Sequence, residues 1–397
     1  MRKAFVKYLF LAGLLSLAAC QSDEPSFSPA SFGQLAINTP TPYDSIGRED
    51  IRCEASLSGD GFFFHEPQAK IHLRGNSTAM RPKHPFLLKL HRECSLFHMP
   101  SAKSWVLLPD YIDRTMLRSA LAFRIGADSW LDWSPRWKFV ELTFNGQAKG
   151  PHVLCEKIQV HPNRVRLPED GWLVEIDAWT EPTDVSFTLP HVAQPVHLHY
   201  PSNPAASQAA EIEALFNKAD EVLFSPDFTD KKEGWRNYLD EQSFIDWYWI
   251  NEIAKNNDAA FFSSCYMHST PDGKIAMGPI WDFDLAFSNS VYNNCNSPEG
   301  WYIRTVQWYA RLFEDPDFAK AAKGRFEWFY AHKTTYLDFV RKNAQMMKTH
   351  ADANEQIWHT YTRQIASSPN MFETYDEHVE ALLTWLEKRF DWIKANL

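Results

Sequence analysis

Residues 278–284 read Gly-Pro-Ile-Trp-Asp-Phe-Asp, so two carboxylates, Asp282 and Asp284, stand among large apolar side chains. The stretch follows a predicted hairpin strand at residues 274–277. A helix predicted to begin at Asp240 lies before that hairpin and is apolar on most faces, which indicates burial. Carboxylates in such a setting are costly unless they bind a cation or are well hydrogen-bonded. This part of the chain is therefore predicted to be core that carries a polar site.

The acid and amide group Asn256-Asn257-Asp258 comes shortly before this stretch. Asp282 and Asp284, with Asn257 or Asn256, would supply the hard oxygen ligands that Mg²⁺ prefers while phosphates complete its shell. Asp258 would then orient or deprotonate an attacking hydroxyl. The residues leave a second interpretation equally open, in which the Asn-Asn-Asp group is a helix-end turn and Asp282 is a hydrogen-bonded core acid.

A polar, glycine-bearing turn at residues 72–78 leaves a predicted strand in the first half of the chain. Lys83 follows the turn and Lys89 lies on the next predicted strand, an arrangement that can hold a nucleoside triphosphate. Glu156, on another strand, would pair with such a lysine. The alternative is an ordinary polar turn with a solvated lysine.

The secondary-structure pattern changes along the chain and predicts an α+β protein. Residues 33–204 read as a β-rich half, with alternating strands, an Asn145-Gly146 hairpin turn and one inserted helix capped by Asp113. A Pro/Ser/Asn stretch at residues 201–204 marks a boundary. Residues 205–397 then read as mainly helical, and they include a hairpin around Pro271-Asp272-Gly273.

The first 20 residues resemble a bacterial lipoprotein signal, with a positive start, a short apolar run and Leu-Ala-Ala-Cys at its end. Residues 1–19 are predicted to be removed, and Cys20 to be acylated. Residues 20–32 form a Ser/Pro/acid tether that is expected to be disordered. We therefore expect a lipid-anchored protein at the outer membrane or cell surface. The five remaining cysteines contain no Cys-x-x-Cys, and the compartment permits one or two disulfides.

The amino-acid composition disfavours one class of function and leaves the role of the many aromatic residues open. The 397-residue chain has a formal net charge of −10, which disfavours sequence-independent nucleic-acid binding. Aromatic residues make up 15% of the chain and include 16 Trp, which would form an aromatic core or provide stacking surfaces for sugars or bases. The stacking interpretation applies mainly to Trp130, Trp133, Trp137 and Trp179, which lie in predicted loops.

The motifs described above, taken in order, resemble the CotH kinase family. The resemblance spans roughly residues 70–290, and no single motif in it would be specific alone. The segments that carry it include Arg74-Gly75-Asn76-Ser77-Thr78, Phe86-Leu87-Leu88-Lys89-Leu90, Phe139-Val140-Glu141-Leu142, Glu156-Lys157-Ile158 and Gly278 to Phe287.

The resemblance implies a two-lobed, atypical protein-kinase-like fold that binds ATP and Mg²⁺ and transfers a phosphoryl group to a Ser/Thr-type acceptor on a protein. By motif position it implies that Asp282, Asp284 and Asn257 hold metal and that Asp258, with Asn257, is catalytic. The implied nucleotide-binding residues are Arg74, Asn76, Ser77, Lys83, Lys89 and Glu156, with Lys89 favoured over Lys83 because it lies on the strand.

Two other functions stay open at this stage. One is a non-catalytic surface lipoprotein that keeps the fold and binds glycan or protein through exposed aromatic residues. The other is an aspartate–metal transferase or hydrolase that acts on sugar phosphates. The kinase is the leading hypothesis, and the scarcity of ATP outside the cytoplasm is the main objection to it and the reason the first of these alternatives stays open.

Overall fold

The computed structural model describes residues 32–181 and 184–397. The predicted signal peptide, Cys20 and nearly all of the predicted tether lie outside the described residues. Within the described ranges, no helix combines the length and apolar character needed to cross a membrane. The five cysteines in these ranges are all free thiols.

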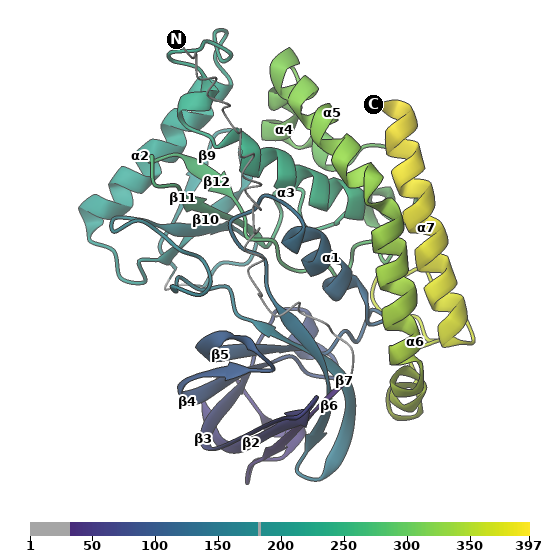
Figure 1. Cartoon of the computed structure of the whole chain (residues 1–397). Coiled ribbons are helices and arrows are strands. Elements are labelled where there is room, and N and C mark those ends of the chain that lie inside the picture. Colours follow the sequence, from purple (N-terminus) through teal and green to yellow (C-terminus); the bar gives the residue numbers. More distant parts are fainter. Residues whose placement is uncertain (1–31, 182–183) are drawn as a thin grey trace, which may run out of the picture.

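The first part of the chain forms a closed barrel of seven strands (Figure 1). Around the barrel the strands follow the order β1-β2-β3-β4-β5-β7-β6, and parallel pairing of β6 with β1 closes it. The strands are β1 (Gly33–Asn38), β2 (Ile51–Gly59), β3 (Phe62–Leu73), β4 (Phe86–Leu96), β5 (Met99–Leu108), β6 (Trp137–Phe144) and β7 (Gln147–Glu156).

Alternating side chains fill the barrel interior. On β4, Phe86, Leu88 and Leu90 are buried in the barrel core together with Trp105 from β5. Residues between them point to the other face, as the two-residue period of a strand requires. The predicted hairpin turn at Asn145-Gly146 is confirmed, because it joins the antiparallel strands β6 and β7.

A second sheet of five strands lies next to the barrel, above it in the view of Figure 1, in the order β12-β11-β8-β10-β9. The predicted hairpin of the second half is confirmed, because β11 pairs antiparallel with β12. This sheet takes strands from both sides of residue 204. Its strands are β8 (Leu173–Ile176), β9 (Ser186–Leu189), β10 (Val192–Tyr200), β11 (Cys265–Ser269) and β12 (Ile275–Met277).

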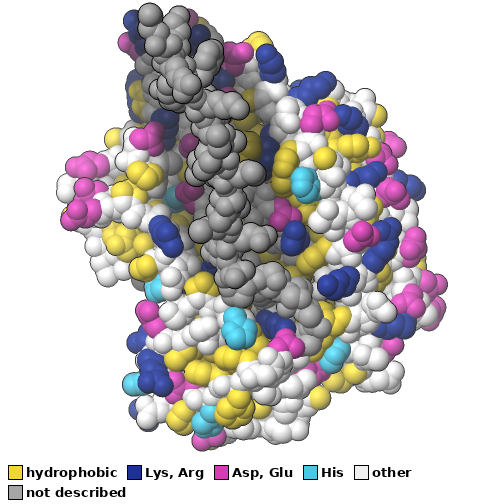
Figure 2. Space-filling model, viewed as in Figure 1, with side chains coloured by type: hydrophobic (Ala, Val, Ile, Leu, Met, Phe, Trp, Pro, Cys, Tyr) yellow, Lys and Arg dark blue, Asp and Glu magenta, His cyan; other side chains and the backbone are white. Residues whose placement is uncertain are grey.

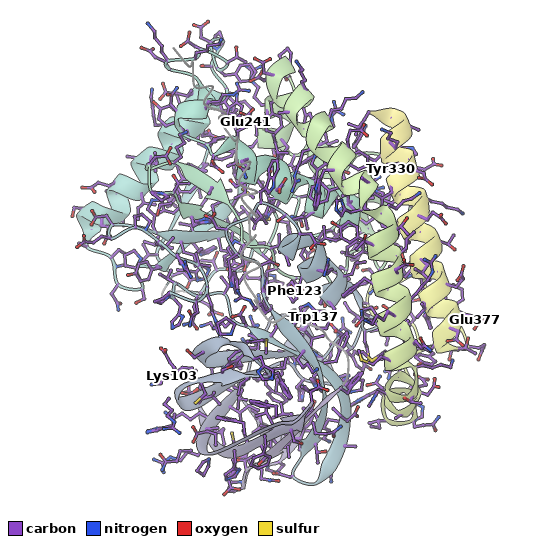
Figure 3. All side chains as sticks on the ribbon, viewed as in Figure 1. Lys103, Phe123, Trp137, Glu241, Tyr330 and Glu377 are labelled. Atoms are coloured by element: carbon purple, nitrogen blue, oxygen red, sulfur yellow. The ribbon has the colours of Figure 1, made fainter. Side chains whose placement is uncertain are left out.

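Helices form the rest of the molecule. The inserted helix α1 (Arg118–Ala127) is buried, and the Asp113 carboxylate accepts hydrogen bonds from the backbone N–H groups of Leu117 and Arg118 at its start. Phe123 of α1 and Trp137 of β6 belong to one core cluster that runs from the barrel into the helices (Figure 3). The remaining helices are α2 (Ala206–Leu223), α3 (Glu241–Ala254), α4 (Gln307–Leu312), α5 (Pro316–Ala331), α6 (Lys333–Trp358) and α7 (Tyr375–Asn396).

Helix α6 joins the barrel to the helical part. Its Asn354 side-chain oxygen accepts a hydrogen bond of 2.9 Å from Lys83, and its His350 ring nitrogen lies 2.8 Å from Glu141 on β6. Gly150 has a φ of +75°, and a Cβ at this position would collide with the Asn354 side chain. The close approach of α6 therefore requires glycine at this point of β7.

The expected two-lobed, kinase-like fold is wrong, although the α+β class holds. The first seven strands of the β-rich half close into a barrel, and its last three strands join a separate sheet with strands from the second half. Alternation along each strand predicts which face is buried, but it does not determine which strands pair. The parallel pairing of Gly33–Ile37 with Val140–Phe144 brings together segments about a hundred residues apart, so no local pattern reveals it.

Most of the aromatic residues are core, as one of the two interpretations predicts. Trp133 and Trp137 are buried, whereas Trp130 and Trp179 keep 58% and 56% of their surface exposed. The stacking interpretation therefore remains for Trp130 and Trp179 alone among the four candidates. On the face shown in Figure 2, basic and acidic side chains are interspersed over the helical region.

Candidate functional site

A cavity of about 1390 Å³ opens where the barrel meets the second sheet. Its walls come from the turn after β3, the segments that follow β5 and β7, strands β8 and β10, and the loop after α3. The segment 281–285 forms a further part of the wall. The fold therefore brings residues that are far apart in sequence into the wall of a single cavity.

Three carboxylates predicted from the sequence line this cavity: Asp258, Asp282 and Asp284. Burial, followed by the nearby Asp258 carboxylate, raises the pKa of Asp282 to about 7. Burial and then Asp282 raise the pKa of Asp284 well above its usual range. Burial also raises the pKa of Asp258. Burial is the largest cause of all three shifts, and repulsion from neighbouring carboxylates adds to those of Asp282 and Asp284, since both effects disfavour the charged form.

The fourth carboxylate of the cluster, Asp110, lies two residues after the end of β5 and was not predicted. It is 7% exposed, one of its oxygens has no hydrogen-bond partner among the described residues, and burial raises its pKa to about 7. The Asp282 charge contributes to that shift. Asp110 therefore belongs to the same electrostatic cluster.

The end of α3 positions this cluster. The helix stops at Lys255, whose backbone is left-handed with a φ of +46°, and the Lys255 ammonium donates to three loop carbonyls between Asn294 and Glu299. The next residue, Asn256, donates a 3.0 Å hydrogen bond to the backbone oxygen of Asp282. Asp282 itself has a φ of +60°. The two acidic segments are thus tied together by one buried amide.

Asn257 supports Asp258 and is hydrogen-bonded on both sides. Its amide nitrogen donates to Asp258 Oδ1 at 2.8 Å, and its amide oxygen accepts from Asn293 at 3.2 Å. The Tyr302 hydroxyl donates to the Asn257 backbone oxygen at 2.7 Å. This geometry fits a residue that orients the Asp258 carboxylate.

Basic side chains from the barrel line the cavity and give this wall a positive charge. Arg74, Asn76 and Ser77 line it, and the Arg74 guanidinium lies 5.1 Å from the ring centre of Trp281. One terminal nitrogen of Arg74 is buried without a partner in the described part of the chain. Lys157, which follows β7, also lines the cavity, and burial followed by the Arg74 charge lowers its pKa.

The turn after β3 depends on Gly75. Its φ is +81°, and a Cβ there would collide with the Thr78 hydroxyl. Arg48 donates a 2.6 Å hydrogen bond to the Gly75 carbonyl, which fixes the turn from outside the cavity. A side chain at this position would disturb the placement of the neighbouring Arg74 and Asn76.

The other three predicted nucleotide-binding residues lie away from the cavity lining. Lys83 is fully buried and donates to the Pro151 carbonyl at 2.5 Å as well as to Asn354. Lys89 lies on the outer face of the barrel, 2.8 Å from Asp50. The Glu156 carboxylate is buried against the backbone N–H of Arg136 at 2.9 Å. None of these three side chains therefore lines the cavity, although Lys83 lies close enough to Asp110 of the acidic cluster for their charges to interact.

The donor set fits a Mg²⁺ ion that is shared with phosphates. Within the described ranges no three His, Cys, Asp or Glu side chains form a complete metal site. Mg²⁺ usually takes one or two carboxylates and completes its shell with water and phosphate oxygens. Asp282 and Asp284 supply that number, and their mutual repulsion would be relieved by a divalent cation. Arg74 and Lys157 supply the charges that phosphates need.

A sequence model of the CotH kinase protein family matches residues 71–393, which is most of the chain and all of this cavity. The chain belongs to the CotH kinase family. Family membership suggests a kinase-like function and is compatible with the use of ATP. No curated protein matches the sequence.

Asp110 and Lys157 are the residues of this CotH family site that the sequence reasoning missed. Each lies just past the end of a buried strand, where a side chain leaves the barrel core and reaches its rim. A polar residue within two positions of the end of an apolar strand was the available signal. Lys157 directly follows Glu156, which was predicted to bind the nucleotide. The alternation of the strand places the two side chains on opposite faces.

Proposed function

We propose that the chain is a phosphotransferase that uses ATP and Mg²⁺ and transfers a phosphoryl group to the hydroxyl of a Ser/Thr-type acceptor on a protein. The observation that carries this proposal is the cluster of Asp258, Asp282 and Asp284 in one cavity, opposite Arg74 and Lys157. Phosphoryl transfer requires both kinds of side chain, because acidic residues hold the metal ion and basic residues hold the phosphates.

Each residue has a separate task in this proposal. Asp282 and Asp284 hold Mg²⁺, which would neutralise charge on the phosphate oxygens when bound. Arg74 and Lys157 contact phosphates, together with the turn that carries Asn76 and Ser77.

Asp258 accepts the proton of the acceptor hydroxyl while the oxygen–phosphorus bond forms and the bond to the leaving diphosphate breaks. Its raised pKa makes it a better base than an ordinary aspartate. Asn257 keeps its carboxylate oriented through the 2.8 Å hydrogen bond.

The proposal extends to location. The lipoprotein-like sequence at residues 1–20 supports a lipid-anchored protein at the outer membrane or cell surface, whose acceptor is a protein of the cell envelope or its surroundings. The acidic net charge supports an acceptor other than nucleic acid.

Calorimetry of ATP binding to the full chain, with and without Mg²⁺, tests the proposal. We expect Mg²⁺-dependent binding in the parent and at least a tenfold loss in Asp282→Asn. The matched control is Asp272→Asn, which changes an exposed aspartate at the hairpin turn and should bind as the parent does. Absence of Mg²⁺-dependent binding in the parent refutes the proposal.

A thermal melt separates loss of a ligand from loss of the fold. Asp282→Asn removes one of several repelling carboxylates, so without Mg²⁺ it should melt at the parent temperature or above it. Addition of Mg²⁺ and ATP should raise the melting temperature of the parent and leave that of the variant unchanged. A variant that gains as much as the parent would overturn the assignment of Asp282.

A further inference from the structure

A second cavity, of about 430 Å³, lies in the helical part and shares no lining residue with the first. It is bounded by the start of α3, by α5, by the loop after α1 and by Lys274 of the β11–β12 hairpin. Glu241, the first residue of α3, lies far from the barrel (Figure 3). Nothing in the proposed phosphotransfer uses this cavity.

An exposed and firmly held Trp130 forms one wall. The Arg325 guanidinium lies 3.8 Å from the centre of its ring and is itself backed by Trp328 at 4.3 Å. The buried Asp246 carboxylate accepts from the Trp130 backbone N–H at 2.5 Å and from Arg325 at 2.6 and 2.8 Å. A buried ion pair thus fixes an aromatic ring that is 58% exposed.

Arg325 holds the ring in place and does not offer a free donor to the cavity. It is 5% exposed, and Nη1, its one nitrogen without a hydrogen-bond partner among the described residues, has almost no accessible surface. The polar side chains that the lining offers to a bound molecule are those of Gln242 and Lys274.

The charges around the cavity are largely compensated. Arg236 pairs with Glu241 at 2.8 Å and with Asp315 at 2.6 Å. Lys274 lies 3.3 Å from Asp272. A strongly charged ligand would meet a partner already neutralised or a group of its own sign. A neutral molecule rich in hydroxyl groups would find donors and acceptors without that conflict.

We propose that this second cavity binds a neutral saccharide. One pyranose ring stacks its C–H face on the exposed surface of Trp130 that Arg325 leaves uncovered, and its hydroxyls bond to Gln242 and Lys274. The volume lies within the range of small-molecule sites and suits a mono- or disaccharide unit. An aromatic face with a few fixed polar groups is the general pattern of such sites.

Calorimetry of the full chain with cellotetraose, maltotetraose and xylotetraose, and with tetragalacturonate as a charged comparison, tests this proposal. We expect at least one neutral tetrasaccharide to bind, and Trp130→Ala to weaken that binding at least tenfold. Trp179→Ala removes an equally exposed tryptophan from the first cavity and should leave saccharide affinity unchanged.

Three results would each overturn the proposal: no binding of any neutral probe, binding of tetragalacturonate alone, or unchanged binding in Trp130→Ala. If Trp130→Ala fails to fold, Lys274→Met on the exposed hairpin takes its place and should weaken binding severalfold. Unchanged affinity in that variant counts equally against the site. ATP binding in the same samples reports on the first cavity separately.

Discussion

Replacement of Arg389 by methionine should destabilise the whole protein. Arg389 of α7 makes an ion pair with Glu252 of α3, and both side chains are completely buried. The guanidinium donates five hydrogen bonds: three to the backbone and side-chain oxygens of Glu252, and one each to the carbonyls of Pro298 and Gly300. One cation therefore connects two helices and a loop.

The size of the destabilisation follows from the Glu252 carboxylate, which the substitution leaves buried without its counter-charge. Methionine keeps much of the side-chain volume, so the cavity contribution is small, but the Glu252 carboxylate loses its buried counter-charge. Among the described residues, its remaining hydrogen-bond partners are the backbone N–H groups of Tyr302 and Arg304, at 2.9 Å each. Removal of one member of a buried pair costs about 3–5 kcal/mol. We expect the free energy of unfolding of Arg389→Met to fall by this amount.

Urea denaturation followed by circular dichroism measures the effect. Lys394→Met is the matched control, because it lies on the same helix and breaks an exposed pair with Glu327. Such a pair contributes at most about 1 kcal/mol. The double variant Glu252→Gln with Arg389→Met should recover part of the loss, since no uncompensated charge remains. A loss below about 1 kcal/mol in Arg389→Met would refute the reasoning that rests on the buried-pair penalty.

Three further predictions concern single side chains. Lys83→Met should lower the urea midpoint, because it removes the hydrogen bond to Asn354, and it should change ATP affinity by less than twofold. A tenfold loss of ATP affinity would show that Lys83 takes part in nucleotide binding. Burial, and then neighbouring arginines, lower the pKa of His378 to about 4, so the folded state excludes a proton that the unfolded chain binds below about pH 6.5. Stability should therefore fall as the pH drops from 6.5 to 4, and less so in His378→Gln, as urea midpoints across this range would show. Gly75→Ala should weaken ATP binding at least tenfold in calorimetry, because its Cβ would collide with the Thr78 hydroxyl at a φ of +81°, and an unchanged affinity would contradict the role of that turn.

Local structure was largely predictable from the sequence because its causes are local. The Asp240 carboxylate caps α3 by accepting from the Ser243 N–H at 2.9 Å, as the sequence predicted. The β11–β12 hairpin is also where the turn residues indicated it. The closed barrel was not predictable, since its closure depends on a parallel pairing between β1 and β6 that neither strand encodes alone.

The acidic half of the site was easier to predict than the basic half. Asp282 and Asp284 stand among apolar residues, so their sequence setting itself indicates a special role. Lysines carry no comparable signal, because a long flexible side chain is tolerated in many settings. The alternation of Leu88, Lys89 and Leu90 does place Lys89 outside the barrel once the leucines are assigned to the core.

The second sheet implies an order of assembly during synthesis. The barrel can close once residues up to Glu156 are available, because all its strands lie before that point. Strands β8, β9 and β10 can pair with one another first, but the second sheet is complete only when β11 and β12 have emerged. The barrel gains its contact with α6 only when residues near 354 have emerged. Contacts between segments distant in sequence form slowly. The cavity is completed only after its acidic residues at 258–284 have emerged, so a chain truncated before α3 would carry a finished barrel beside an incomplete site.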